Sequence, residues 1–407
     1  VFDLECRLIP LLVAMRMKGV AVDLDAAERA YDSIDAEISS TQSRIDDLAG
    51  FTGVDTASPT AMKKVFDDLS IKYQTTPTGQ VSLAAKNLEG IRHPIVKMMV
   101  DLAELKKYNS TFIQGSILDS NVNGIIYSQF NPLGAKTGRF SSSDPNLQQV
   151  PSKNELAKRV RRVFVPHEGA RYWRKYDYAS VENRVFAEFA VGEAGKKLRQ
   201  QYIDDPFTDY HNWCLDMVAP IAGWDVSTPE LYKSKRKPIK NINFGIVYGL
   251  MARSLSAQLG ISLAEAQNLL NSYHSALPHV KDTMDFLSNE ADVNGYSETI
   301  LGRKVLFNMW EPDEWSDTPQ TPMKREDALS YYGFNRRKAG LYRATNYTIQ
   351  GSAADLMKEA MVQCWEQGVF DATGIPTMTV HDELNFSDYG GEDEAFLEMA
   401  HIMETAI

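Results

Sequence analysis

The sequence has few cysteines and no long apolar run, and both shortages narrow what the protein can be. Three of its 407 residues are cysteines, far apart at Cys6, Cys214 and Cys364. This spacing excludes a zinc knuckle and argues against a disulfide framework. No apolar stretch approaches the roughly eighteen residues of a membrane helix, and no signal peptide is visible. We therefore expect a protein of the reducing cytoplasm that does not enter membranes.

An excess of positive charge is also missing. The net charge is −11, which disfavours nucleic-acid binding, because neutralised phosphates supply much of that affinity. The basic residues are nevertheless clustered, at residues 158–162, 233–240 and 336–338. These clusters leave a local basic channel within an acidic protein open as an alternative.

Several familiar motifs are absent as well. Residues 192–196 are too short for a Walker-type phosphate loop and lack its Ser or Thr, and there is neither a Gly-x-Ser-x-Gly elbow nor an HExxH pair. A chain of this length, 43% hydrophobic, can form two or three lobes. Because it begins at Val1 rather than Met, we expect a piece of a longer protein.

Residues 233–249 are the most distinctive stretch that is present, because a basic run turns into an apolar one. Within it Arg236, Lys240, Phe244 and Tyr248 recur every fourth residue. On a helix each such step advances about 40° beyond a full turn, so the four side chains form one slowly winding stripe. Cations followed by rings suit a ligand with a polyphosphate, a sugar and a base. A solvated basic turn leading into a core helix explains the stretch alone equally well.

Acidic residues at predicted strand ends suggest a metal site. Asp177 follows a strand predicted at residues 171–176, and Asp382 and Glu383 lie at the tip of a hairpin predicted at 377–386. Carboxylates on adjacent sheet ends can share hard cations such as magnesium. Two such ions about 4 Å apart can promote an in-line phosphoryl displacement. Each carboxylate alone is more typical of a helix cap or a solvated turn.

The remaining pattern predicts a helical beginning, strands from both halves of the chain in one sheet, and a helical excursion between them. Helices are expected in residues 1–120, including one started by Ser58 and Pro59 and one at 93–112, and again at 181–190, 196–300 and 346–366. Residues 308–332 have no clean period and predict a long loop or insertion. The polar loop at 136–149 is dense in hydrogen-bonding side chains.

Five segments, in the right order, resemble the polymerase portion of DNA polymerase family A, the DNA polymerase I group. Within this group the sequence is similar in character to the bacteriophage members. This similarity would place the protein in the cytoplasm of a bacterial host. The likeness runs nearly end to end and is weakest over 24–57 and 308–340. The segments that carry it are residues 137–151, 177–184, 236–249, 350–355 and 380–383.

The resemblance implies an α+β right-hand polymerase fold, with an antiparallel-sheet palm, helical fingers and a helical thumb. Residues 1–125 would be mainly thumb, with a short segment joining an upstream domain. The palm would be split between 126–190 and 346–407. The fingers would occupy 191–345, with an insertion at 308–332. Exonuclease carboxylates would lie upstream, so no proofreading is expected in these residues.

The resemblance also implies roles for individual residues in template-directed addition of dNTPs to a primer, with release of pyrophosphate. Asp177 and Asp382 would hold two Mg²⁺ ions, for which Mn²⁺ can substitute, with the Tyr178 carbonyl as a further ligand and Glu383 as a weaker or supporting one. Lys240 would donate a proton to pyrophosphate. The nucleotide would contact Arg236, Lys240, Phe244, Tyr248, His211 and Glu182. The DNA would contact Arg139, Asn146, Gln148, Gln149, Gln350 and His381.

Two of these residues would also select the nucleotide sugar. Glu182 would exclude a 2′-hydroxyl, and Phe244, which lacks a phenol, predicts discrimination against dideoxynucleotides. Primer–template DNA and dNTPs are thus the expected partners of a monomer, and the resemblance also allows processivity or replisome proteins. The chain departs from the family pattern at Ser180, which replaces the usual Gln. It also departs at Pro238, which predicts that Arg236 lies just outside the regular helix.

Two alternatives remain open at the level of sequence. A single-subunit RNA polymerase shares the fold, but Glu182 and Phe244 oppose it because that group leaves space for the 2′-hydroxyl. A catalytically silent DNA-binding scaffold would keep the fold, but the intact Asp177, Asp382 and Lys240 oppose that interpretation.

Overall fold

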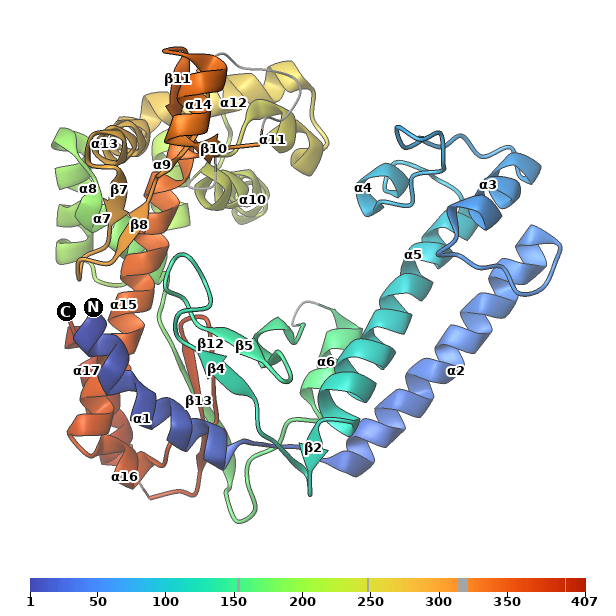
Figure 1. Cartoon of the computed structure of the whole chain (residues 1–407), viewed down its shortest axis with the longest axis horizontal. Helices are drawn as coiled ribbons and strands as arrows, with labels where there is room; N and C mark the ends of the chain where they lie inside the picture. Colours follow the sequence, from blue (N-terminus) through green and yellow to red (C-terminus); the bar gives the residue numbers. More distant parts are fainter. Residues whose placement is uncertain (152–153, 247–248, 314–320, 392) are drawn as a thin grey trace.

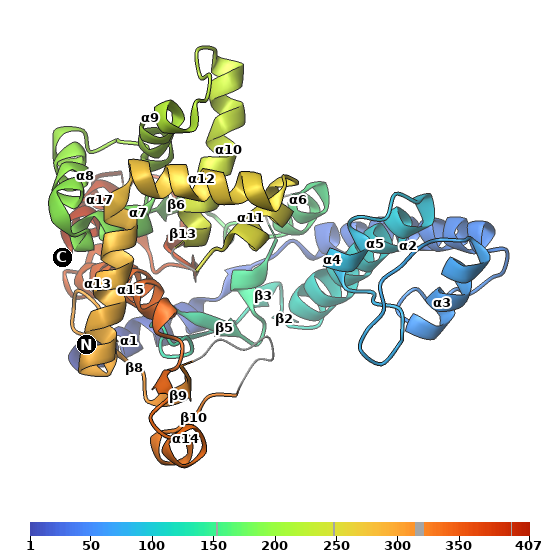
Figure 2. The same ribbon diagram turned by 90° about the horizontal axis from the view of Figure 1, so that it is seen from above.

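An antiparallel sheet lies at the centre of the computed structural model, with a helical lobe on one side and a long helical arm on the other (Figures 1 and 2). The structure describes residues 1–151, 154–246, 249–313, 321–391 and 393–407. In this part of the chain, no helix is both long and apolar enough to cross a membrane.

The central sheet has the order β12–β13–β6. Its strands are β12 (Met378–Val380), β13 (Glu383–Asp388) and β6 (Tyr172–Asp177). Side chains alternate between the faces of a strand, and Leu384 and Phe386 of β13 are fully buried in the main apolar core. The sheet core is completed by α15 (Ala344–Glu366), α16 (Val369–Thr373) and α17 (Asp393–Thr405). The predicted strand into Asp177, the hairpin and the helix near 346–366 are thus confirmed.

The first helix, α1 (Phe2–Lys18), belongs to this sheet core. Its buried face includes Leu4, Leu8, Leu11 and Met15, whose three- and four-residue spacing is that of an amphipathic helix. The face packs against α15, and Figure 1 shows α1 beside α15 and the sheet rather than in the arm.

The arm, residues 24–118, consists mainly of two long helical segments that run side by side (Figures 1 and 2). One is α2 (Leu24–Ala49), and the other is α5 (Pro94–Lys107) continued by the π-helix η1 (Tyr108–Leu118). The predicted helix at 93–112 is confirmed, and it begins at Pro94 because His93 caps it. The short helices α3 (Pro59–Asp68) and α4 (Ala85–Leu88) lie at the outer end, which has its own apolar cluster.

A small sheet closes the base of the arm. Its strands are β1 (Val20–Ala21), β3 (Ile125–Ile126) and β2 (Asn121–Val122), in that order. The chain then forms β4 (Gln129–Asn131) and β5 (Ser141–Ser143), which pair across the loop 132–140. The segment after β5 contains the 3-10 helix η2 (Leu147–Gln149) and α6 (Glu155–Arg161).

The helical lobe has a separate apolar core. Its helices are α7 (Val181–Phe189), α8 (Gly192–Asp204), α9 (Tyr210–Ala222), α10 (Pro229–Ile246), α11 (Ala252–Leu259), α12 (Leu263–Ala276) and α13 (Pro278–Asn294). The prediction that Pro238 places Arg236 outside the regular helix is wrong, because α10 runs through both residues. Ile239, Ile242 and Ile246 bury one face of α10 in the lobe core, and this packing outweighs the lost backbone hydrogen bond.

A hairpin and a small outer unit connect the lobe to α15. The hairpin pairs β7 (Tyr296–Glu298) with β8 (Lys304–Leu306). The outer unit pairs β9 (Met309–Pro312) with β10 (Met323–Lys324) and with β11 (Arg336–Lys338), and it carries α14 (Arg325–Tyr332). The expectation of an irregular loop at 308–332 is therefore wrong for the described residues of that range. Strands of two to four residues are too short to show a period in the sequence.

Candidate active site

The two predicted metal-binding aspartates meet at one end of the central sheet. Asp177, the last residue of β6, pairs in register with Glu383, the first residue of β13. The backbone N–H of Tyr178 donates to the carbonyl of Asp382 at 3.3 Å. Burial raises the pKa of the Asp177 carboxyl, and the negative charges of Asp382 and Glu383 raise it further. Negative charge thus accumulates here, and a bound cation would relieve it.

Asp382 is presented by a tight turn. Val380 pairs with Glu383, so His381 and Asp382 are the two residues between the strands. His381 has a φ of +58°, a conformation that costs free energy in most residues other than glycine and that is frequent at functional sites. The turn therefore fixes Asp382 and His381 together.

Glu383 is engaged by its own neighbours. Its Oε2 accepts from Lys175 Nζ at 2.7 Å, and its Oε1 accepts from Asn385 Nδ2 at 2.9 Å. A carboxylate with a paired cation and a bound amide has less charge to offer a metal ion. The geometry favours the supporting role for Glu383 over that of a ligand.

The donors that remain fit magnesium better than a metal held by protein side chains alone. Among the described residues, no three His, Cys, Asp or Glu side chains are gathered so as to hold a metal ion. Asp177, Asp382 and the Tyr178 carbonyl are hard oxygen donors, and the Tyr178 side chain is anchored away from them by its hydroxyl, which donates to the Met403 carbonyl at 2.7 Å. Mg²⁺ typically takes one or two carboxylates and completes its shell with water and phosphate oxygens.

The exposed face of α10 carries the predicted nucleotide-binding residues. Lys240 is exposed, and its Nζ lies 5.7 Å from the centre of the Phe244 ring, which is itself 48% exposed. Arg236 is held against α9, where its Nη2 donates to Asp209 Oδ2 at 2.5 Å and its Nε to Asn212 Oδ1 at 2.6 Å. Tyr248, predicted to stack near the templating base, lies outside the described residues.

His211 lies behind Phe244, with 5.2 Å between the ring centres. The Tyr273 hydroxyl donates to Asn243 Oδ1 at 2.7 Å, so the Asn243 amide nitrogen faces His211 Nδ1, 2.9 Å away. Nδ1 must then accept, and the neutral ring carries its proton on Nε2. Burial lowers the pKa of His211 to about 4. The ring is therefore a neutral donor through Nε2 at ordinary pH.

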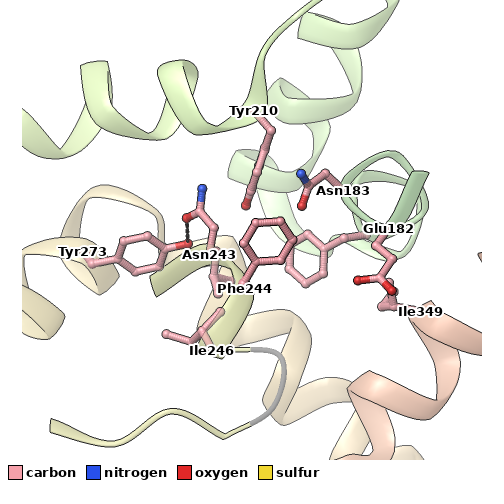
Figure 3. Close-up of a pocket in the computed structure, with 10 residues that line it drawn as sticks. Glu182, Asn183, Tyr210, Asn243, Phe244, Ile246, Tyr273 and Ile349 are labelled. Carbon is pink, nitrogen blue, oxygen red and sulfur yellow. Dashed lines mark hydrogen bonds between the residues drawn. The ribbon is translucent and has the colours of Figure 1, made fainter. Parts of the chain in front are cut away.

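Glu182 and Phe244 line one pocket between α7, α10 and α15. Figure 3 shows the Phe244 ring between the Asn243–Tyr273 pair and the Glu182 carboxylate. The other lining residues are Asn183, Phe186, Tyr210, Asn243, Ile246, Tyr273, Val280 and Ile349. The sequence prediction missed Asn243 and Tyr273. The position of Asn243 directly before Phe244 was a usable signal, whereas Tyr273 is 30 residues away.

A second, smaller pocket contains Asp382 and His381 together with Arg139 and residues of α15. Arg139 comes from the loop 132–140, and its Nη2 donates to Glu182 Oε1 at 2.5 Å. Arg139 therefore contacts the residue that lines the first pocket while itself lining the second. The two pockets meet at this ion pair.

The other predicted DNA-binding residues are less uniform. Asn146 caps η2 through a bond from the Gln148 backbone at 3.1 Å, and Gln148 Nε2 donates to the Thr379 carbonyl at 3.3 Å. Both side chains thus have internal contacts, whereas Gln149 is exposed. Gln350 lies half-buried on α15, one residue before Gly351.

Comparison with known proteins finds the same family over most of the chain. The family model described as "DNA polymerase family A" matches residues 24–407. The thermostable DNA polymerase I of Thermus filiformis is 31% identical over 390 residues, which cover 94% of this chain and 43% of that protein. A DNA-directed DNA polymerase of Pseudomonas phage M6 is 27% identical over 469 residues, covering 100% of this chain and 63% of that protein.

A solved structure matches the fold. The POL domain of Pol1 from M. smegmatis, in complex with DNA primer-template and dNTP, superposes with a TM-score of 0.81 at 28% identity, over 99% of this chain and 67% of that one. This confirms the predicted fold class. The chain spans less than half the length of the thermostable relative. Bacterial and bacteriophage proteins both match, so a bacteriophage-type origin stays a prediction.

Proposed function

The chain belongs to DNA polymerase family A, and on that premise we propose that it is a template-directed DNA polymerase. It would add dNTPs to a primer 3′-hydroxyl and release pyrophosphate. The observation that carries the proposal is the Arg139–Glu182 ion pair at 2.5 Å. This pair joins the pocket lined by Phe244 to the pocket lined by Asp382. A nucleotide sugar and a primer terminus held in the two pockets would be neighbours.

The carboxylate end of the sheet would be the metal site. Asp177, Asp382 and the Tyr178 carbonyl would hold two Mg²⁺ ions, which when bound lower the pKa of the primer hydroxyl and neutralise triphosphate charge. Lys175 and Asn385 keep Glu383 beside them without leaving it as an unpaired charge. The register of β6 and β13 sets the separation of the two aspartates before any substrate arrives.

The exposed side of α10 would bind the triphosphate. Lys240 lies on the exposed side of this helix. It would neutralise phosphate oxygens and protonate departing pyrophosphate. His211 would donate through Nε2, since its Nδ1 already accepts from Asn243. Two of the five N–H donors of Arg236 are bonded to Asp209 and Asn212. Others would donate to the phosphates.

The pocket between Glu182 and Phe244 would select the sugar. The Glu182 carboxylate, fixed by Arg139, would leave no room for a 2′-hydroxyl. Phe244 offers a flat apolar face without a hydroxyl, so a 3′-hydroxyl on the nucleotide itself would be needed for tight binding. Tyr248 would stack near the templating base.

We further propose that the lobes form a hand that would hold primer–template DNA. We assign the thumb to the arm at 24–118, the fingers to the lobe and the outer unit, and the palm to the central sheet together with α1. These bounds differ from the expected thumb at 1–125 because α1 packs against α15, and from the expected palm at 126–190 because α7 packs in the lobe core. Arg139, Gln350 and His381 would contact the minor groove at the primer terminus, where acceptors are common to all correct base pairs. Asn146, Gln148 and Gln149 would contact the DNA from the segment around η2. The structural neighbour is in complex with DNA primer-template and dNTP, which supports these assignments.

The full alignment with the bacteriophage relative supports a bacteriophage-type enzyme. It would then act as a monomer in the cytoplasm of a bacterial host, with processivity or replisome proteins as further partners.

Primer extension tests the proposal. The wild-type protein should extend a primer with dNTPs in the presence of Mg²⁺ or Mn²⁺, and EDTA or replacement of dNTPs by rNTPs should suppress extension. Asp177→Asn and Asp382→Asn should each reduce incorporation by at least about a thousandfold while DNA binding, measured by fluorescence anisotropy, persists.

Asp3→Asn is the matched control, because Asp3 is an exposed carboxylate on α1 whose nearest cation, Arg7, is 3.5 Å away. It should extend primers at the wild-type rate. Normal extension by both the Asp177 and Asp382 variants would show that the metal assignment is wrong.

A further inference from the structure

Four ionised side chains that the proposed mechanism does not use are buried beneath the loop 132–140. They are Glu5 of α1, Arg303 of the turn between β7 and β8, and Asp355 and Lys358 of α15. Arg303 Nη2 donates to Glu5 Oε1 at 2.5 Å, and Arg303 Nε donates to Asp355 Oδ1 at 2.8 Å. Lys358 Nζ donates to Glu5 Oε1 at 2.6 Å. We call these four residues the buried network.

Stability alone does not explain this network. Two cations balance two anions, but all four side chains are removed from water, with Asp355 and Lys358 fully buried. Glu5 Oε2 has no hydrogen-bond partner. Buried ion pairs can often be replaced by apolar side chains of similar volume without loss of stability, and what they add is directional specificity. Such a network is therefore expected to orient the segment that it contacts.

The network holds the loop 132–140 at both ends and in the middle. At the start, Lys358 Nζ donates to the Pro132 carbonyl at 2.8 Å. At the end, the same Nζ lies 5.3 Å from the centre of the Phe140 ring. In the middle, Gly138 lies so close to Arg303 that a Cβ on it would be 2.5 Å from Arg303 Nε.

The residue between these contacts is Arg139. Its backbone follows Gly138, which rests on Arg303, and precedes Phe140, which rests on Lys358. Its side chain reaches Glu182 at 2.5 Å and lines the pocket that contains Asp382. The buried network therefore fixes the direction in which the Arg139 side chain extends from the loop.

We propose that Glu5, Arg303, Asp355 and Lys358 are positioning residues that hold Arg139 against the primer terminus, because their buried contacts grip the loop on either side of it. The inference rests on the proposed polymerase function. It adds that primer alignment depends on α1, the β7–β8 turn and α15 acting through one loop. A displacement of about 1 Å at such a group is enough to lower a rate about a hundredfold.

A chemical change in the primer tests this link. A primer whose 3′-terminal guanine has carbon in place of N3 lacks the minor-groove acceptor that Arg139 would contact. Wild-type protein should incorporate the next nucleotide about tenfold more slowly on this primer than on the natural one, as expected for loss of a charged hydrogen bond. Arg139→Ala should be slow on both primers and show no such ratio.

The decisive variant is Glu5→Gln combined with Lys358→Met. It removes one charge of each sign, so the Arg303–Asp355 pair stays balanced, and it deprives Pro132 of its donor. It should lower incorporation on the natural primer and reduce the ratio between the primers to less than about twofold. Arg174→Met with Asp388→Asn is the matched control, because it removes another ion pair, 2.6 Å apart, on the central sheet, in which Asp388 is fully buried and Arg174 is half-buried. This control should keep the tenfold ratio.

A second variant covers the case in which the double variant fails to fold. Gly138→Ala should press on Arg303 and reduce the ratio. Gly50→Ala is its control, because Gly50 has a φ of +77°, close to the +80° of Gly138, but no atom lies within 4 Å of the added Cβ. Gly50→Ala should leave the ratio unchanged. A tenfold ratio retained by the network variant, or by Gly138→Ala, would overturn the inference. So would a wild-type enzyme that is indifferent to the N3 change. Failure of the polymerase proposal is distinct, because wild-type protein would then extend neither primer.

Discussion

Removal of the Tyr273 hydroxyl tests how the structure orients His211. Tyr273 is fully buried, and its hydroxyl is the donor that turns the Asn243 oxygen away from His211. In Tyr273→Phe that oxygen loses its buried partner, which should lower the free energy of unfolding by about 1–3 kcal/mol. The Asn243 amide is then free to rotate and present its oxygen to His211 Nδ1.

Rotation of this amide reverses the hydrogen-bonding polarity of the imidazole. With an acceptor opposite Nδ1, the neutral ring carries its proton on Nδ1, and Nε2 can no longer donate to a phosphate. Loss of one hydrogen bond to a charged group is worth about 1.5–3 kcal/mol. We therefore expect kcat/KM for dNTP to fall roughly 10- to 150-fold, mainly through KM, with DNA affinity unchanged.

Single-nucleotide incorporation over a range of dNTP concentrations measures this effect. Tyr202→Phe is the control, because the Tyr202 hydroxyl is also buried in the lobe but has no hydrogen-bond partner, so its removal should leave both stability and KM near wild type. In a His211→Ala background, Tyr273→Phe should add no further loss in kcat/KM. If Tyr273→Phe is less stable but keeps the wild-type KM, or if its loss adds to that of His211→Ala, the orientation argument is refuted.

Three further predictions concern the same lobe. Phe244→Tyr adds a hydroxyl opposite Glu182, and it should reduce discrimination against dideoxynucleotides by about tenfold, as measured by competition between ddNTP and dNTP; an unchanged ratio would place the sugar elsewhere. Lys240→Ala should slow single-turnover incorporation about 10²- to 10⁴-fold with DNA affinity unchanged, and a wild-type rate would remove Lys240 from the phosphate site. Burial lowers the pKa of both His211 and His279 to about 4, so their neutral forms contribute stability that is fully present above about pH 6.5 and is lost as pH falls through 4. Protonation of each histidine should lower the free energy of unfolding by about 2.5 kcal/mol by pH 4.5. Urea unfolding at pH 7 and pH 4.5 would measure this loss, which should be smaller in His279→Gln than in wild type. Equal losses in the two proteins would contradict the pKa shift at His279.

The carboxylate site was predictable because it depends on short-range pattern. A strand that ends at Asp177 and a two-residue turn that contains Asp382 are both visible in the sequence, and antiparallel pairing brings such ends together. The stripe of Lys240 and Phe244 was predictable for the same reason, since helical spacing is local.

The contacts that the sequence did not reveal join residues far apart in the chain. Arg236 was expected to be available to phosphate, yet Asp209, 27 residues earlier, holds part of its guanidinium. Pro238 was expected to end the regular helix, but burial of one face of α10 in the lobe outweighs its local preference. Glu5 and Lys358 are 353 residues apart, and no local spacing records such a pair.

The separate apolar cluster at the outer end of the arm has a consequence for measuring the stability of this protein. Because this cluster is separate from the main core, the outer end can lose its packing first, and melting need not be a single cooperative event. All six tryptophans lie outside residues 24–118, whereas most of the arm is helical. Tryptophan fluorescence is therefore blind to the arm, and circular dichroism is not. Non-coincident transitions from these two signals would reveal an outer end of the arm that melts separately from the main core.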